Sequence, residues 1–298
     1  MRILNRSILA LLLGIFSLQA QSVGTGLTFL KTGTDARSTS MGEASVSLTD
    51  DHSAFFYNPA AIRFSDQRQI SLSHRQGFAE TTSDYLGATL PGNSVTFGFS
   101  AFTTSVSDIE VRQLPGEAEG TFSARNGSIG LGAAISLTDD IAFGVGGKLL
   151  YEKIYIDEAS GYGIDAGLLY RINHEINAGL SIVNFGSMSV LRSERSKLPT
   201  TLRLGASYHA PLAEIVELTA AADMVKTLDD EQTHLHAGAE AVYDSMVMLR
   251  AGFQSGYETR SFSFGAGVRY SIIRVDYAFI PMSGAFTPNH TFSLTFHL

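Results

Sequence analysis

The chain has 298 residues, a formal net charge of −8 and neither cysteine nor tryptophan. The acidic balance disfavours nucleic acid as a partner. A chain without cysteine has no disulfide, no thiolate metal site and no cysteine-linked lipid anchor. Charged residues make up only 17% of the sequence, whereas glycine and phenylalanine occur 29 and 19 times. A soluble exported protein of this size usually carries more charge, so the composition favours a chain in contact with lipid.

The first twenty residues have the features of a secretory signal peptide. Arg2 and Arg6 precede the apolar run Ile8–Phe16, and a plausible cleavage site follows Ala20. Such a short run does not span a bilayer as a helix, which needs ~20 apolar residues. We therefore predict that residues 1–20 are removed, and loss of the two arginines takes the net charge from −8 to −10. No later apolar run reaches that length, so strands must make any membrane crossing.

From residue 68 onward, apolar and polar residues alternate with a period of two. In SFSFGAGVRY (261–270) the even positions are apolar and the odd positions are small or polar. This alternation is typical of strands with one apolar face. Most such segments have ten or more residues, whereas strands of soluble sandwiches average ~5–6 and tilted membrane strands ~9–11. About fourteen strands are predicted, near 68–75, 82–91, 93–105, 123–137, 140–155, 160–173, 174–185, 200–210, 214–227, 232–244, 246–257, 260–272, 273–283 and 289–298.

The connections between these segments alternate in length. The longest are Val106–Phe122 and Gly186–Thr200, whereas Pro91–Asn93 and Asn173–His174 are tight turns. Short turns on one side and long loops on the other are typical of outer-membrane barrels. The even strand number places the C-terminus on the periplasmic side. The loop at 107–121 is acidic, whereas that at 186–199 is basic and suits lipopolysaccharide or an acidic partner, unless it is only a solvated loop.

The strand faces opposite the apolar ones carry charges of both signs. A barrel lumen can hold such charges in contact with water or with one another, whereas lipid cannot. The predicted fold is therefore all-β, a transmembrane antiparallel β-barrel over residues 67–298. A soluble β-sandwich or propeller is the alternative, which strand length and low charge disfavour. The charged positions predicted to face the lumen are Lys148, Glu152, Asp165, Arg171, Arg203, Glu217, Asp223, Glu240, Arg250, Arg269, Arg274 and Asp276.

Residues 21–66 do not alternate and carry isolated aromatic residues that a flexible tail would lack. A barrel of fourteen strands is too wide for its own side chains to fill. We therefore predict that residues 21–66 form a plug in the lumen. Asn58 and Pro59 can start a short helix there, because Asn caps well and Pro at the first position costs no hydrogen bond. The aromatic residues expected to pack against the wall are Phe29, Phe55, Phe56 and Tyr57.

The same segment resembles a known family. The motifs are DAR at 35–37, MGEA at 41–44, Asp50-Asp51 and YNPA at 57–60. Together they resemble the N-terminal signature of the PorV/PorQ family, which is similar to the FadL-type fatty-acid transporters of outer membranes. The resemblance implies a FadL-like barrel with an N-terminal hatch in the outer membrane of a Gram-negative bacterium. It assigns the plug motif to Asp50, Asp51, Asn58, Pro59 and Ala60.

The resemblance implies more than one function. PorV-like barrels capture secreted proteins of the type IX system and pass them to surface attachment, and PorQ-like members anchor another component. We therefore expect a monomeric barrel in outer-membrane lipid that contacts secreted proteins or other secretion-system components. FadL-like uptake of hydrophobic molecules is the alternative. In that case an apolar pocket should form where Phe29, Phe55, Phe56 and Tyr57 meet the wall. A structural porin is a third class, which the plug disfavours.

Motifs with catalytic or metal-binding chemistry are weak. Asp50, Asp51 and His52 could ligate a cation, but no further carboxylate follows at loop spacing, so we expect a solvated turn. His234 and His236 share a strand face, yet no third zinc ligand is evident. The glycine-rich stretches do not lead from a strand into a helix, and there is no Gly-x-Ser-x-Gly elbow. We predict no metal, no cofactor and no enzymatic activity.

Overall fold

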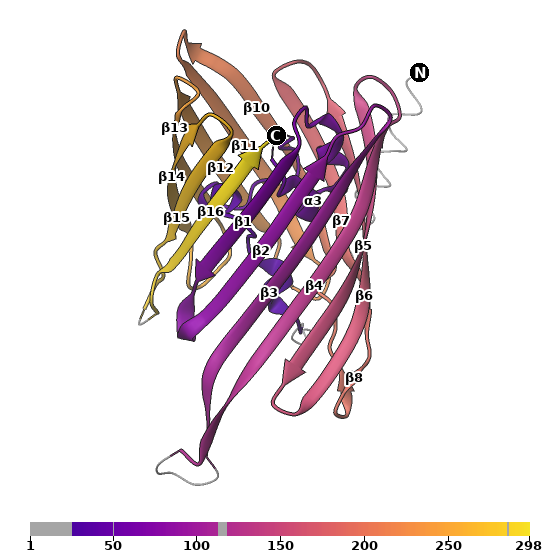
Figure 1. The fold of residues 1–298 in the computed structure, drawn as a ribbon, viewed down its shortest axis with the longest axis vertical. Helices are drawn as coiled ribbons and strands as arrows, with labels where there is room; N and C mark the ends of the chain where they lie inside the picture. Colours follow the sequence, from indigo (N-terminus) through magenta and orange to yellow (C-terminus); the bar gives the residue numbers. More distant parts are fainter. Residues whose placement is uncertain (1–25, 50, 113–117, 285) are drawn as a thin grey trace.

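The computed structural model describes residues 26–49, 51–112, 118–284 and 286–298. The predicted signal peptide lies outside these residues. Fourteen strands form a closed antiparallel barrel, which confirms the predicted fold, and β16 pairs with β1 to close it (Figure 1). The strands are β1 (Gln69–Gln76), β2 (Thr81–Leu90), β3 (Val95–Val111), β4 (Gly120–Ser136), β5 (Ile141–Ile154), β6 (Asp157–Arg171), β7 (Ile176–Met188), β10 (Thr201–Ala213), β11 (Val216–Thr227), β12 (His234–Tyr243), β13 (Val247–Gln254), β14 (Phe262–Tyr270), β15 (Ile273–Ile280) and β16 (Asn289–His297).

The two faces of the barrel differ as their sequence pattern predicts. Outward positions expose large apolar side chains, such as Leu149 at 70% and Leu249 at 63%, while Lys148 and Arg250 beside them are buried. All twelve charged positions predicted to face the lumen do so. Arg171, Glu217 and Arg269 line a cavity at one end, and the other nine are buried: Lys148, Glu152, Asp165, Arg203, Asp223, Glu240, Arg250, Arg274 and Asp276. No helix in the described part of the chain is long and apolar enough to cross a membrane.

The barrel has a turn end and a loop end. The turn end holds the short connections, such as those at 91–94 and 244–246, and the C-terminus. At the loop end, the predicted loop from Val106 to Phe122 is largely strand, because β3 and β4 keep pairing beyond a register shift after Val106. The resulting arm projects past the rest of the barrel (Figure 1). The other long loop carries a small hairpin of β8 (Val190–Leu191) and β9 (Glu194–Arg195).

Residues 26–49 and 51–66, called the plug below, lie inside the barrel (Figure 1). They contain four short helical segments: η2 (Thr28–Lys31), α2 (Ala36–Ser40), α3 (Ala54–Tyr57) and η3 (Pro59–Phe64). The segment crosses the lumen lengthwise. A Cβ on Gly26 would touch Ser196 at the loop end, whereas Ser65 and Asp66 line the turn-end cavity just before β1. The plug therefore fills space in the lumen that the side chains of the wall alone could not fill.

Glycines on the wall let the plug backbone come close. A Cβ added at Gly144 would lie 2.4 Å from the backbone of Pro59 and Ala60. A Cβ at Gly132 would lie 2.4 Å from the Phe55 ring. Such separations are well inside normal van der Waals contact, so a larger residue at either position would force the neighbouring atoms to move. The glycines in the strand pattern thus make room for the plug.

Candidate functional site

The aromatic residues of the plug pack into two apolar clusters against the wall. Phe29, Phe56 and Tyr57 meet Tyr85 and Phe102, and the rings of Phe29 and Phe102 lie 5.3 Å apart. These side chains are between 1% and 8% exposed. Aromatic pairs at this spacing add about 0.5–1.5 kcal/mol to the burial of their surfaces. This packing holds the plug against β2 and β3.

Phe55 belongs to a different cluster. It packs with alanines and Ile62 of the plug and with Leu169 of the wall. Of the four aromatic residues expected to contact a ligand, Phe56 and Tyr57 line the same cavity in the described part of the chain, whereas Phe29 and Phe55 do not line it. The four therefore do not form one common pocket in the described structure.

Asn58 fixes the plug to itself and to the wall. Its Oδ1 accepts a hydrogen bond from the Ala60 N–H at 3.0 Å, and Pro59 is the first residue of η3. Its Nδ2 donates to Val46 O at 2.8 Å and to Leu168 O at 3.1 Å. Asn58 and Ala60 are fully buried. The helix-start pattern read from the sequence thus marks a short 3-10 helix anchored to β6. Asp50 of the same motif lies outside the described residues.

Six charged side chains form a closed ring of alternating sign inside the barrel, called the charged ring below. Two of them come from the plug and four from β12, β13 and β15. Their shortest N–O distances are 3.4 Å for Arg37–Asp51, 2.7 Å for Asp51–Arg274, 2.7 Å for Arg274–Asp276, 2.7 Å for Asp276–Arg250, 2.5 Å for Arg250–Glu240 and 2.7 Å for Glu240–Arg37.

The ring is neutral, with three guanidinium groups and three carboxylates. Each of its side chains is at most 7% exposed. Buried ions are tolerated only when their partners offset the lost hydration, and here every carboxylate contacts two guanidinium groups. Removing one partner of a buried pair costs ~3–5 kcal/mol, because it leaves an uncompensated charge. The ring therefore ties the plug to one side of the barrel wall.

Asp51 and His52 are part of this buried network. Burial by itself would raise the pKa of the Asp51 carboxyl, but His52, Arg274 and Arg37 outweigh it and hold the pKa well below its usual range. Asp51 is 3% exposed and His52 is fully buried. The prediction of a solvated turn is therefore wrong for both residues. Arg274, which neutralises Asp51, lies 223 residues further along the chain, so no local pattern could reveal the pairing.

Glu43 forms a second contact of charged groups between plug and wall. Its carboxylate accepts from the Gly33 N–H at 3.0 Å and lies 3.6 Å from Arg260. Burial by itself would raise the pKa of Glu43, but Arg260, Arg203 and Arg75 outweigh it, so the net shift of the pKa is downward. Glu43 therefore stays charged in the folded barrel at neutral pH.

The two candidate zinc histidines have other partners. His234 stacks on Tyr257 with ring centroids 4.2 Å apart, and its Nε2 lies 3.2 Å from Asp230. The Nε2 of His236 lies 3.1 Å from the Tyr257 hydroxyl. Both histidines are buried on the lumen face.

Two cavities open at opposite ends of the lumen. The turn-end cavity has a volume of about 590 Å³ and is lined by charged residues that include Arg171, Arg250 and Glu217. The loop-end cavity has a volume of about 270 Å³ and is lined by Phe56 and Arg203, among others. They share no lining residue, because the plug lies between them.

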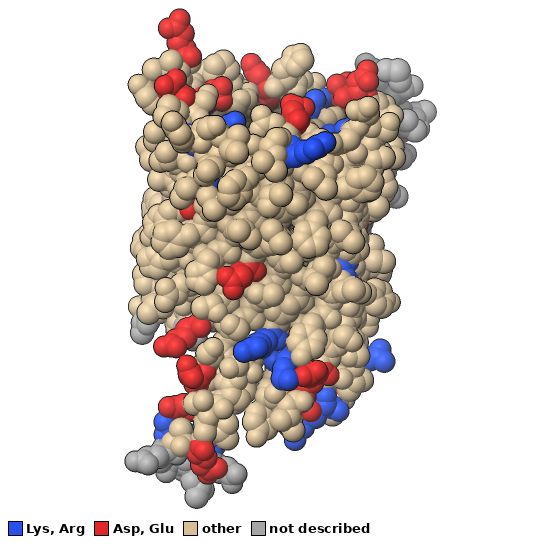
Figure 2. Space-filling view, viewed as in Figure 1, with Lys and Arg blue, Asp and Glu red and all other residues tan. Residues whose placement is uncertain are grey.

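The hairpin β8–β9 presents a basic surface at the loop end. Arg192, Arg195 and Lys197 are exposed. The base of the loop is fixed, because Leu198 is buried in the aromatic cluster and Ser196 Oγ donates to Glu152 at 2.5 Å. On the face shown in Figure 2, charged residues of both signs gather at the turn end and at the loop end, with few charges on the band between. That band matches the lipid-facing belt of a membrane barrel.

Comparison with known proteins identifies the family. Residues 51–296 match the family described as type IX secretion system membrane protein PorP/SprF. The chain belongs to the PorP/SprF family. The resemblance to PorV/PorQ pointed to the same secretion system, but the matching family is PorP/SprF. No curated protein matches this chain significantly.

Solved structures support the fold of this PorP/SprF chain. The toluene transporter TbuX of Ralstonia pickettii has 13% identity and a TM-score of 0.65, with 89% of this chain and 98% of that chain covered. The toluene transporter TodX of Pseudomonas putida has 14% identity and a TM-score of 0.62, with coverage of 89% and 96%. A FadL homologue of Pseudomonas aeruginosa has 12% identity and a TM-score of 0.55, with coverage of 93% and 98%. The barrel is thus FadL-like, and fold and family place it in the outer membrane.

Proposed function

We propose that this PorP/SprF barrel acts in type IX secretion by protein–protein contact, in the export or surface attachment of secreted proteins in a Gram-negative bacterium. The observation that carries the proposal is the plug, which fills the lumen between two separate cavities. A barrel closed in this way offers its ends and loops to partners and gives a solute no open path. PorV-like transfer of secreted proteins and PorQ-like anchoring are two forms of this role.

Uptake of hydrophobic molecules is the competing function, and the loop-end cavity fits it poorly. Sites for small molecules usually measure ~300–1,000 Å³ and are mostly apolar. This cavity has about 270 Å³, and Lys31, Arg203 and Arg260 line it beside the aromatic residues. Burying an apolar ligand against these cations would cost them hydration.

The proposal assigns the turn end to the periplasm and the loop end to the outside, because outer-membrane barrels keep their short turns in the periplasm. An epitope inserted at Ser193, between β8 and β9, is expected to bind antibody on intact cells. The same epitope at Asp139, in a turn-end connection, should be detected only after lysis. The reverse pattern would show that the topology is inverted and that the basic hairpin lies in the periplasm.

The function is tested by purifying the barrel from its native host in mild detergent and identifying co-purifying proteins by mass spectrometry. Secreted proteins or secretion-system components are expected. Arg195→Ser should reduce the amount of co-purifying protein. It should also make that amount depend less on salt, because charges at the rim of an interface affect the rate of association. Arg68→Ser removes an exposed arginine at the turn end and serves as the matched control. A bound hydrophobic compound with no protein partner would favour the transporter instead.

A further inference from the structure

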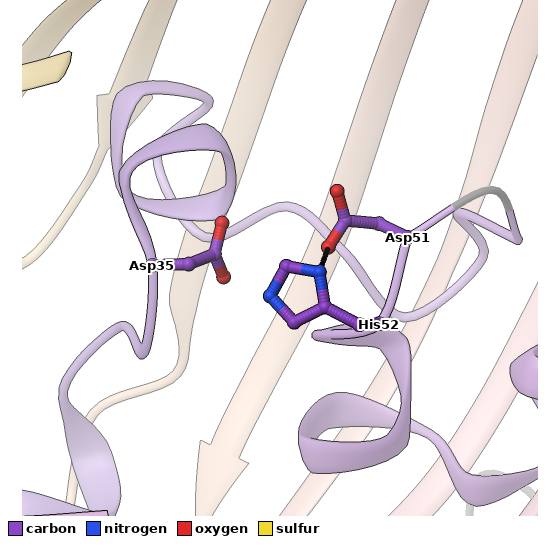
Figure 3. Close-up of side chains that lie close together, drawn as sticks. All are labelled: Asp35, Asp51 and His52. Carbon is purple, nitrogen blue, oxygen red and sulfur yellow. Dashed lines mark ion pairs between the residues drawn. The ribbon is translucent and has the colours of Figure 1, made fainter. Parts of the chain in front are cut away.

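Asp35, Asp51 and His52 come together inside the plug. The His52 ring stands between the two carboxylates (Figure 3). One ligand-type atom from each residue lies within 4.8 Å of the other two. All three residues are at most 3% exposed. Asp35 caps α2, and Asp51 and His52 precede α3, so the cluster joins the two α-helices of the plug.

Neither ring nitrogen of His52 has a hydrogen-bond partner among the described residues. Nδ1 lies 3.0 Å from Asp51 Oδ1, within ion-pair distance of that carboxylate. Nε2 is buried and has no hydrogen-bond partner among the described residues. Figure 3 shows this nitrogen on the side of the ring that faces Asp35. A buried polar atom without a partner is costly, so this nitrogen requires an explanation.

Asp35 differs from the carboxylates of the charged ring. Among the described residues, the groups that donate hydrogen bonds to its carboxylate are neutral: Ser38 N at 3.0 Å, Ser38 Oγ at 2.7 Å and Thr34 Oγ1 at 3.1 Å. Among the ion pairs of the described residues, none includes Asp35. A buried carboxyl group therefore faces an imidazole nitrogen without a partner. A cation held between the two groups would satisfy both.

We propose that the plug holds a divalent transition-metal ion of the Zn²⁺ class between His52 Nε2 and the Asp35 carboxylate. Imidazole and carboxylate are ligands of such ions, and a carboxylate on the second ring nitrogen, here Asp51, is the usual support for a metal-bound histidine. The Tyr85 hydroxyl is also buried with no hydrogen-bond partner among the described residues, and its ring lies 6.1 Å from that of His52.

The spacing suits such an ion after a small adjustment. Two ligand atoms bound at ~2.1 Å to one metal lie at most ~4.2 Å apart. A carboxylate oxygen of Asp35 already lies within 4.8 Å of a ring nitrogen of His52, so small rotations of the two side chains would close the site. The ion would link α2 to the segment before α3 and hold the plug in its folded form.

The proposal is tested on the whole barrel in detergent, stripped with EDTA and then given Zn²⁺ alone. We expect one Zn²⁺ per chain by elemental analysis, and slower hydrogen exchange in α2 and α3 when Zn²⁺ is bound. Asp35→Asn should weaken Zn²⁺ binding by on the order of 100-fold, since even loss of an outer-shell partner costs ~10–100-fold. Asp84→Asn is the matched control. Its carboxylate pairs with His74 at 2.8 Å, but both side chains are more than half exposed.

Zn²⁺ binding that both variants leave unchanged would overturn the proposal, because it would come from another site. A wild-type barrel that takes up no Zn²⁺ would overturn it too and would leave a proton as the cation between Asp35 and His52. The wild-type measurement stands even if Asp35→Asn does not fold. Because metal content is independent of co-purifying proteins, the outcome does not depend on the proposed function.

Discussion

Replacing Arg37 with glutamine should loosen the plug while leaving the barrel intact. Arg37 holds Glu240 through Nε at 3.1 Å and Nη2 at 2.7 Å, and its Nη1 lies 3.4 Å from Asp51. Without the guanidinium the charged ring carries a net charge of −1. A buried charge left in this way costs ~3–5 kcal/mol, which corresponds to roughly a 100-fold or larger rise in the loosened population. The strand ladders keep all their hydrogen bonds.

Hydrogen exchange followed by mass spectrometry measures this effect directly. Amides of α2 and α3 should exchange faster in Arg37→Gln, while those of β12 and β13 serve as an internal reference. The double variant Arg37→Gln/Glu240→Gln restores neutrality. Its effect should fall short of the sum of the single variants by ~0.5–3 kcal/mol, the range for residues in one network. Lys153→Gln, which breaks an exposed pair with Glu158, should leave exchange in the plug unchanged.

Two outcomes would refute this reasoning. If Arg37→Gln exchanges like the wild type, then the plug is held by its apolar contacts and the ring contributes little. If the single and double variants add without coupling, then the bond between Arg37 and Glu240 is not the source of the effect. Faster exchange throughout the barrel would indicate that the ring stabilises the wall rather than the plug.

Gly144→Ala should lower the thermal stability of the barrel by ~1–3 kcal/mol through overpacking against the plug, whereas Gly147→Ala, with open space around its Cβ, should not. Replacing Asn58 and Pro59 together with alanine removes a cap worth ~1 kcal/mol and two bonds to carbonyl groups, so antibiotic permeability of cells should rise; unchanged permeability would count against the plug. Because Asp51 has a depressed pKa when folded, its contribution is complete above its unfolded pKa, ~3.9, and is lost as the pH falls through the folded value. The protection factors of the plug amides, which are corrected for the pH dependence of intrinsic exchange, should therefore fall in acid, and protection factors that stay constant down to pH ~3 would contradict this assignment.

The sequence by itself determined the barrel. Alternation with a period of two identifies each strand and its two faces, and a strand of ten residues has enough repeats to make the pattern clear. For this reason charged positions such as Lys148, Arg203 and Asp276 were assigned correctly to the lumen. The strand limits at the loop end were less certain, since β3 and β4 continue beyond the belt, where apolar alternation is no longer required.

The tertiary structure alone decided how the plug and the wall fit together. Sequence motifs indicated that Asn58 and Pro59 start a helix, because a cap is a local feature. They could not show that Arg37 meets Glu240, which lies 203 residues away, or that Asp51 and His52 are buried. Ion pairs and metal ligands depend on distances across the lumen, and these are fixed only when the barrel closes around the plug. The order and spacing of charged residues along the chain do not specify those distances.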